Sequence, residues 1–166
     1  MSDPAMEPIR DEAERIRESA TYCAQGQYEA AKRWRSIHWW LGVLATGLGA
    51  CGAVLTFADG SQIAAGALTL VAAIVAAVMT GVRPDKLAER AQVSGNDYTS
   101  LRNDVRRFLN VDLAIDSVAD ARKRLEALAG RANELDHAAD PIPNWAYTRA
   151  KENIDNGGQD FEADQS

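Results

Sequence analysis

The sequence predicts an all-α protein in which a two-helix transmembrane hairpin stands between long cytoplasmic helices, with no significant β structure. Three observations support this fold class. Residues 39–58 (WWLGVLATGLGACGAVLTFA) and 63–82 (IAAGALTLVAAIVAAVMTGV) are apolar and uncharged. The single formal charge between Arg35 and Arg83 is Asp59, in the joining stretch FADGSQ. The polar remainder of the chain repeats its apolar residues every three or four positions, which is the period of a helix.

Each apolar stretch has the length of a membrane span. A helix of about 20 residues rises about 30 Å, the thickness of the hydrocarbon layer. A helix in a soluble core normally keeps a polar stripe toward water, whereas residues 63–82 contain only Thr69 and Thr80 as polar side chains. We therefore expect a transmembrane hairpin over residues 36–83, with a buried soluble hairpin as the alternative.

The charges beside the two spans predict their orientation. The connecting loop has no Lys or Arg, whereas basic residues precede the first span and follow the second: Lys32, Arg33, Arg35, Arg83, Lys86 and Arg90. Positive flanks stay in the cytoplasm, so both termini are expected to be cytoplasmic. Trp34, Trp39 and Trp40 would lie at the inner boundary. Asp59 and Gly60 would form a minimal turn outside.

The cytoplasmic parts are expected to be helical. Residues 1–35 form an amino-terminal helix that Gln25-Gly26-Gln27 weakens, and residues 84–156 form a second helical region, with a kink or a restart of the helix at Pro84. Asn96 or Asp97 and, further on, Asp116 are candidate helix caps. Residues 157–166 are an acidic sequence typical of a disordered tail.

One helix of the second region has an unbroken apolar seam. Its members are spaced alternately three and four residues apart: Val118, Ala121, Leu125, Leu128, Ala132, Leu135 and Ala139. A seam of three heptads requires a partner helix, either within the chain or from another copy in a coiled coil. Asp140-Pro141 ends this helix, and NWAYTRAKENI forms a shorter one after it.

Small residues in the spans predict close helix packing. In the first span they are Ala45, Gly49 and Ala53, and in the second Ala65, Thr69, Ala73, Ala77 and Gly81. Small side chains let transmembrane backbones approach, within the hairpin or between protomers. GLGACG in the first span has the glycine spacing of a dinucleotide-binding loop. Since it has no preceding strand, we expect no cofactor there.

Residues typical of catalysis are nearly absent. The two histidines, His38 and His137, lie apart, and the sequence shows no nucleophile with a nearby base, no phosphate-binding loop and no metal-ligand spacing. Cys23 and Cys51 do not form a disulfide framework. A net charge of −6 disfavours nucleic acid as a partner. We therefore expect a protein that is not an enzyme and holds no cofactor or metal.

The order of these segments resembles the SLATT family. The similarity covers roughly residues 9–157 and includes AERIRESATYCAQGQYEAAKRW before the spans, NDYTSLRNDVRRFLNVDL after them and PIPNWAYTRAKENIDNG near the end. These are two-transmembrane effector domains associated with nucleotide-synthesising and nucleotide-sensing partners in bacterial conflict systems. The resemblance implies an anti-phage membrane effector that receives a nucleotide-dependent signal and then permeabilises or depolarises the inner membrane. It supplies no catalytic residue.

Two spans cannot enclose a pore, so such an effector would have to form a homo-oligomer in the lipid bilayer. Its pore would be apolar, because the spans hold no charge. The alternative function is a non-enzymatic membrane scaffold whose cytoplasmic coiled-coil helices recruit partners.

Overall fold

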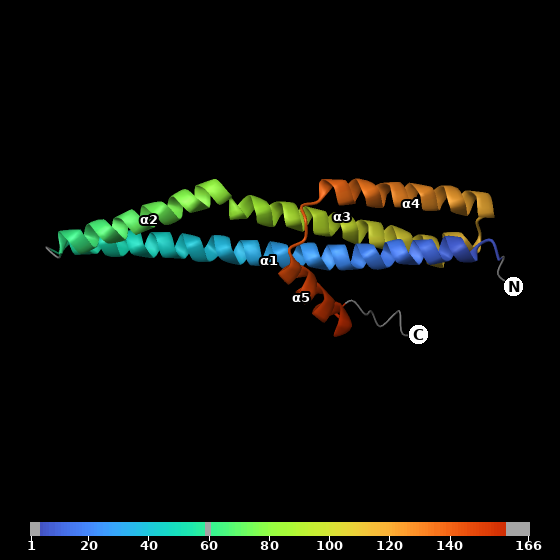
Figure 1. Ribbon diagram of the computed structural model, residues 1–166, viewed down its shortest axis with the longest axis horizontal. Helices are drawn as coiled ribbons and strands as arrows, with labels where there is room; N and C mark the ends of the chain where they lie inside the picture. Colours follow the sequence, from blue (N-terminus) through green and yellow to red (C-terminus); the bar gives the residue numbers. More distant parts are fainter. Residues whose placement is uncertain (1–3, 59–60, 159–166) are drawn as a thin grey trace. The chain divides into compact units, whose positions relative to one another are not determined.

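The structure is a computed structural model that describes residues 4–58 and 61–158. The described residues contain helices and no strand, which confirms the all-α prediction (Figure 1). The helices are α1 (Glu7–Phe57), α2 (Gln62–Val82), α3 (Pro84–Asn110), the 3₁₀ turn η1 (Asp112–Ala114), α4 (Val118–Ala138) and α5 (Asn144–Asp155). The predicted turn at Asp59 and Gly60 and residues 159–166 of the predicted tail lie outside the described residues.

The chain divides into two compact units. One comprises residues 1–30 and 90–166, and the other comprises residues 31–89. The predicted hairpin, residues 36–83, lies within the second of these units. Both boundaries between the units fall inside continuous helices, α1 and α3, so no linker separates the units.

Helix α1 has 51 residues and is continuous through Gln25-Gly26-Gln27, where the sequence predicts a weak point. Tertiary contacts explain the difference. A β-carbon on Gly26 would lie 3.0 Å from Cγ2 of Ile142, so the glycine leaves room for that side chain. The buried Gln27 donates from Nε2 to the carbonyl oxygen of Asp140 at 2.8 Å. Packing against the segment after α4 thus outweighs the low helix propensity of glycine.

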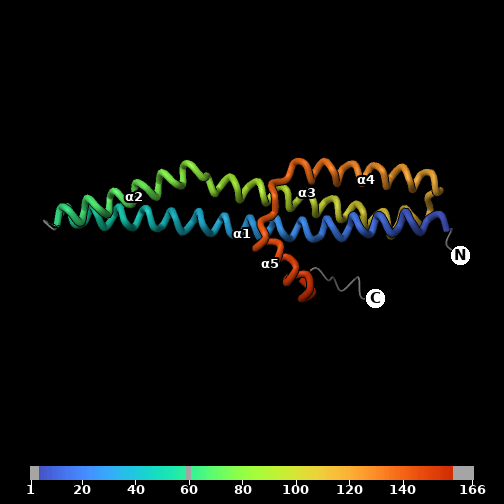
Figure 2. Tube along the Cα trace, in the orientation of Figure 1, coloured from blue at the N-terminus to red at the C-terminus, as the bar shows by residue number. Residues whose placement is uncertain are grey.

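Three helical segments form the core of the 1–30/90–166 unit. Residues 7–30 of α1, α3 and α4 lie side by side (Figure 2). The largest fully buried side chains in this core are Phe108, Leu101 and Val105 of α3. Helix α3 therefore supplies the centre of the unit, with α1 and α4 packed on it.

The helix boundaries confirm one prediction and correct two. Arg83 ends α2 in the left-handed conformation (φ 50°, ψ 58°) and Pro84 begins α3, as the predicted restart requires. Asn96 does not cap a helix, because it lies inside α3 and its Oδ1 accepts a hydrogen bond from the Tyr28 hydroxyl at 3.0 Å. The cap of α4 is Ser117, whose Oγ accepts from the Asp120 amide at 3.2 Å. Asp116 instead pairs with Arg124 at 3.0 Å.

Candidate functional site

Two stretches of helix are long and apolar enough, by length and composition, to cross a membrane, and they lie in α1 and α2. In the most apolar stretch of 18 residues in each helix, only 6% of the stretch is buried inside the protein. Phe57 is 90% exposed and Ile63 is 87% exposed. An apolar helix in a soluble core would have the opposite distribution, with its apolar side chains buried in the protein. The chain therefore does not supply the apolar surroundings that these two helices need.

The contact between α1 and α2 in the 31–89 unit is centred on Gly52. A β-carbon there would lie 2.8 Å from Oγ1 of Thr69 and 3.2 Å from the carbonyl oxygen of Ala65. Buried and half-buried positions then continue along one face of each helix: Ala45, Leu48, Gly52 and Leu55 in α1, and Ala65, Leu68, Ala72, Val75 and Met79 in α2. The spacing alternates between three and four residues, which keeps the contact on one side of each helix.

Most of the predicted small-residue ridge of α2 lies outside this contact. Ala65 is buried and the Thr69 hydroxyl lies against Gly52, whereas Ala73, Ala77 and Gly81 are exposed. Residues spaced four apart are rotated by about 400° around the helix axis, which is about 40° more than a full turn. A ridge built on this spacing therefore drifts away from the contact face after its first members. In the ridge of α1, Ala45 and Gly49 are half-buried and Ala53 is exposed. The alternation of threes and fours through Leu68 and Val75 is also present in the sequence, but the sequence alone does not say which of the two patterns meets α1.

The predicted seam of α4 packs within the chain. Ala121 is fully buried. The other members lie half-buried against the core formed with α1 and α3: Val118, Leu125, Leu128, Ala132, Leu135 and Ala139. The sequence left open a partner helix from the same chain or from another copy, and the structure shows partner helices from the same chain.

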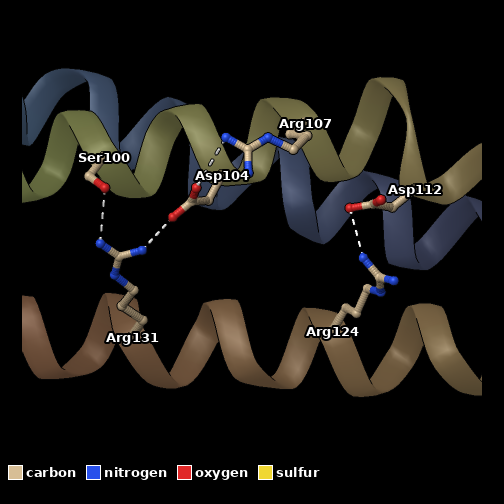
Figure 3. A network of polar contacts seen from close by, with 6 residues as sticks. All are labelled: Ser100, Asp104, Arg107, Asp112, Arg124 and Arg131. Carbon is tan, nitrogen blue, oxygen red and sulfur yellow. Dashed lines mark hydrogen bonds and ion pairs between the residues drawn. The ribbon is translucent and has the colours of Figure 1, made fainter.

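Polar contacts join α4 to α3 and to the segment that connects the two helices (Figure 3). Arg131 pairs with Asp104 and donates from Nη2 to the Ser100 hydroxyl at 3.1 Å. Arg124 bridges two carboxylates, Asp112 at 2.9 Å and Asp116 at 3.0 Å. These side chains are partly exposed, so each pair contributes up to about 1 kcal/mol and serves mainly to set the register of the helices.

A cavity of about 340 Å³ lies between α1, α3 and α4 in the same unit. At its edge the buried Tyr98 donates its hydroxyl proton to Oδ1 of Asp136 at 2.7 Å. Burial and this hydrogen bond raise the pKa of Tyr98 well above its usual range. Burial, with a smaller effect from Asp136, also raises the pKa of the nearby Cys23 thiol. The thiol is therefore held in its neutral, poorly nucleophilic form.

In the described part of the chain, no group of three His, Cys, Asp or Glu side chains is placed to hold a metal ion. His137, Asp136 and Asp140 lie near the end of α4 without forming such a group. Comparison with protein-family models, curated proteins and solved structures found no match. The functional argument therefore depends on the two apolar helices and on the helical unit to which they are joined.

Proposed function

We propose that this protein crosses the inner membrane twice, through residues 39–58 and 63–82, with both termini in the cytoplasm. The observation that supports this most directly is the outward-facing apolar surface of α1 and α2 in the 31–89 unit. Burying one large apolar side chain contributes about 1.5–3 kcal/mol, and most such side chains of this unit are not buried by the protein. Helices satisfy their own backbone polar groups, so they suit a bilayer core.

Within the membrane, we propose a non-enzymatic effector of a bacterial anti-phage system that forms homo-oligomers and depolarises the membrane on a nucleotide-dependent signal. The support is the resemblance to the SLATT family together with the charge-free spans. The signal would come from a nucleotide-synthesising or nucleotide-sensing partner.

Two surfaces could join copies of the protein: the apolar seam of α4 and the small-residue ridge of α2. Their positions favour assembly through the ridge, which lies in a span. The seam of α4 is occupied within the chain, whereas Ala73, Ala77 and Gly81 are exposed on α2. A β-carbon on Gly81 would meet nothing within 4 Å, so this side of α2 is open to another helix. The ridge is thus the surface through which copies would meet.

The orientation is tested by thiol labelling. Cys23 and Cys51 are replaced by Ser, and a single Cys is placed at Ser61 or, in a second variant, at Ser19. A membrane-impermeant maleimide should label Ser61→Cys in intact cells, and Ser19→Cys only after the cells are broken. Equal labelling of both variants in intact cells, or of neither after breakage in detergent, contradicts the proposed crossing.

The effector function is tested by expressing the protein with a candidate nucleotide-synthesising partner and measuring membrane potential with a dye. Ala77→Leu should prevent depolarisation. Ala76→Leu is the matched control, because it adds the same side chain at the same depth about 100° around the helix. Equal depolarisation by the two variants argues against the ridge as the interface. Growth arrest without any change in potential argues against the effector and favours the scaffold, in which the cytoplasmic helices recruit partners.

A further inference from the structure

Helix α1 is enclosed on all sides at one place in the 1–30/90–166 unit. Residues 24–27 are buried at four successive positions, whereas only three of the residues 7–23 are buried. Since successive positions of a helix are about 100° apart, four in a row cover its whole circumference. The cover comes from two directions. Tyr28 contacts α3, and residues 140–155, here called the brace, cover another side.

The brace meets α1 at the weakest point of that helix. A β-carbon on Gly26 would lie 3.0 Å from Cγ2 of Ile142, so this side chain fills the space beside the glycine. Nε2 of Gln27, which is 2% exposed, donates to the carbonyl oxygen of Asp140 at 2.8 Å. The surface of α1 under these contacts is therefore a glycine and a glutamine. Uncovering it exposes polar groups that water can satisfy, which costs much less than exposing large apolar side chains.

The helical part of the brace, α5, has few features that would stabilise it by itself. Its N-cap is Pro143, without a side-chain hydrogen bond, and no acidic residue lies in its first turn and no basic residue in its last. Its buried residues are two alanines, Ala146 and Ala150. The rings of Tyr22 and Tyr147 stack with centroids 6.3 Å apart, while Tyr147 remains 51% exposed. Helices shorter than about 12–15 residues are marginal in water, so the 12 residues of α5 depend on packing against α1.

We propose that the brace is a detachable support of α1, and that its release lets α1 bend or unwind at Gly26. A segment with few buried apolar contacts opens locally at a low free energy. The two weak helices support each other, because α5 needs α1 for its packing, while Gly26, with its low helix propensity, needs the side chain of Ile142 beside it. If the proposed function holds, α1 joins this unit to the first span, and the brace then determines whether α1 transmits a change to that span.

The test is hydrogen–deuterium exchange of the full chain in detergent, followed by mass spectrometry. Ala150→Glu places a charge at a position that is 0% exposed, so it should release α5. The protection of residues 144–155 and of residues 24–30 should then fall together, each at least about tenfold, while residues 101–109 in the core of α3 keep theirs. A tenfold loss is about what one apolar side chain and one hydrogen bond contribute.

Two further variants separate release of the brace from other effects. Thr148→Glu is the matched control, because it adds the same charge at an exposed position of α5, and it should leave all three regions unchanged. Gly26→Ala is added to Ala150→Glu to strengthen α1 without the brace. Alanine favours a helix over glycine about two- to fivefold, so residues 24–30 should regain about that much protection, whereas residues 144–155 should regain none.

Retained protection of residues 24–30 after α5 has lost its own would overturn the proposal, since α1 would then be rigid without the brace. A fall at residues 101–109 as well would show that α5 belongs to the core, and would overturn it too. The same holds for no change in Ala150→Glu, an equal loss in Thr148→Glu, or no recovery with Gly26→Ala. The exchange needs no bilayer, signal or partner protein, so a negative result contradicts the brace alone and not the proposed function.

Discussion

Gly95 of α3 lies against the ring of Tyr28 of α1, and its substitution by alanine should destabilise the protein. A β-carbon there would lie 2.8 Å from Cε1 and 2.9 Å from Cδ1 of Tyr28. The ring of Tyr28 cannot move away without loss, because its hydroxyl makes hydrogen bonds of 3.0 Å with Asn96 Oδ1 and with Thr99 Oγ1. The close approach of the two helices thus depends on the missing side chain.

Two effects of Gly95→Ala oppose each other. Replacing glycine by alanine inside a helix stabilises it by about 0.5–1 kcal/mol. Overpacking costs about 1–3 kcal/mol, and each hydrogen bond of Tyr28 that breaks costs about 0.5–1.5 kcal/mol more. The overpacking is the larger effect, and with one hydrogen bond of Tyr28 broken we expect a net loss of about 0.5–4 kcal/mol in the free energy of unfolding. At Gly130 of α4 a β-carbon would meet nothing within 4 Å, so Gly130→Ala should stabilise by about 0.5–1 kcal/mol.

The assay is thermal unfolding of the full chain in detergent, followed by far-ultraviolet circular dichroism. Each kcal/mol should shift the melting temperature by about 2–4 °C, downward for Gly95→Ala and upward for Gly130→Ala. Tyr28→Ala should remove most of the effect of Gly95→Ala, with a coupling of at least about 0.5 kcal/mol in the double-mutant cycle. If Gly95→Ala raises the melting temperature as Gly130→Ala does, the close contact with Tyr28 is refuted.

Two further predictions concern the 1–30/90–166 unit. Ser117→Ala should lower its stability by about 0.5–2 kcal/mol in the same melts, because α4 loses its amino-terminal cap, whereas Ser117→Thr should retain it, since its hydroxyl can still accept from the Asp120 amide and donate to the Asp120 carboxylate. Equal melting temperatures of these two variants would contradict the capping role. The raised pKa of Tyr98 means that folding favours the neutral phenol, so its contribution is complete below the unfolded value near pH 10 and is lost as pH rises beyond it. Tyr98→Phe should reduce the loss of melting temperature between pH 9 and 12, and an unchanged pH dependence would contradict this.

Local patterns in the sequence were sufficient to predict α4 and the two apolar helical stretches. The seam from Val118 to its last member Ala139 identifies α4, because the alternation of three and four residues is a property of one helix. Pro141 limits α4 for a reason equally local, since proline restricts the residue before it. The absence of charge from residues 39–58 and 63–82 likewise predicted α2 and the second half of α1 as apolar helices.

Contacts between residues far apart in the sequence explain two features of the helices that were not predicted: the continuity of α1 at Gly26 and the position of Asn96 inside α3. Gly26 leaves α1 unbroken because Ile142, far along the chain, fills the space beside it. Asn96 lies inside α3 and accepts a hydrogen bond from Tyr28 of another helix. Neither partner can be found from local propensity, which describes a residue only in relation to its near neighbours.

The candidate surfaces show the same division. The sequence by itself determined that small residues repeat along α2 and that α4 has an apolar seam, since both are one-dimensional patterns. Only the tertiary structure decided which pattern the chain uses internally. The seam of α4 is covered by α1 and α3, whereas Ala73 and Ala77 remain exposed because the contact at Gly52 fixes the rotation of α2 about its axis. Rotation about a helix axis depends on side chains of both partners, and no single helix sequence contains that information.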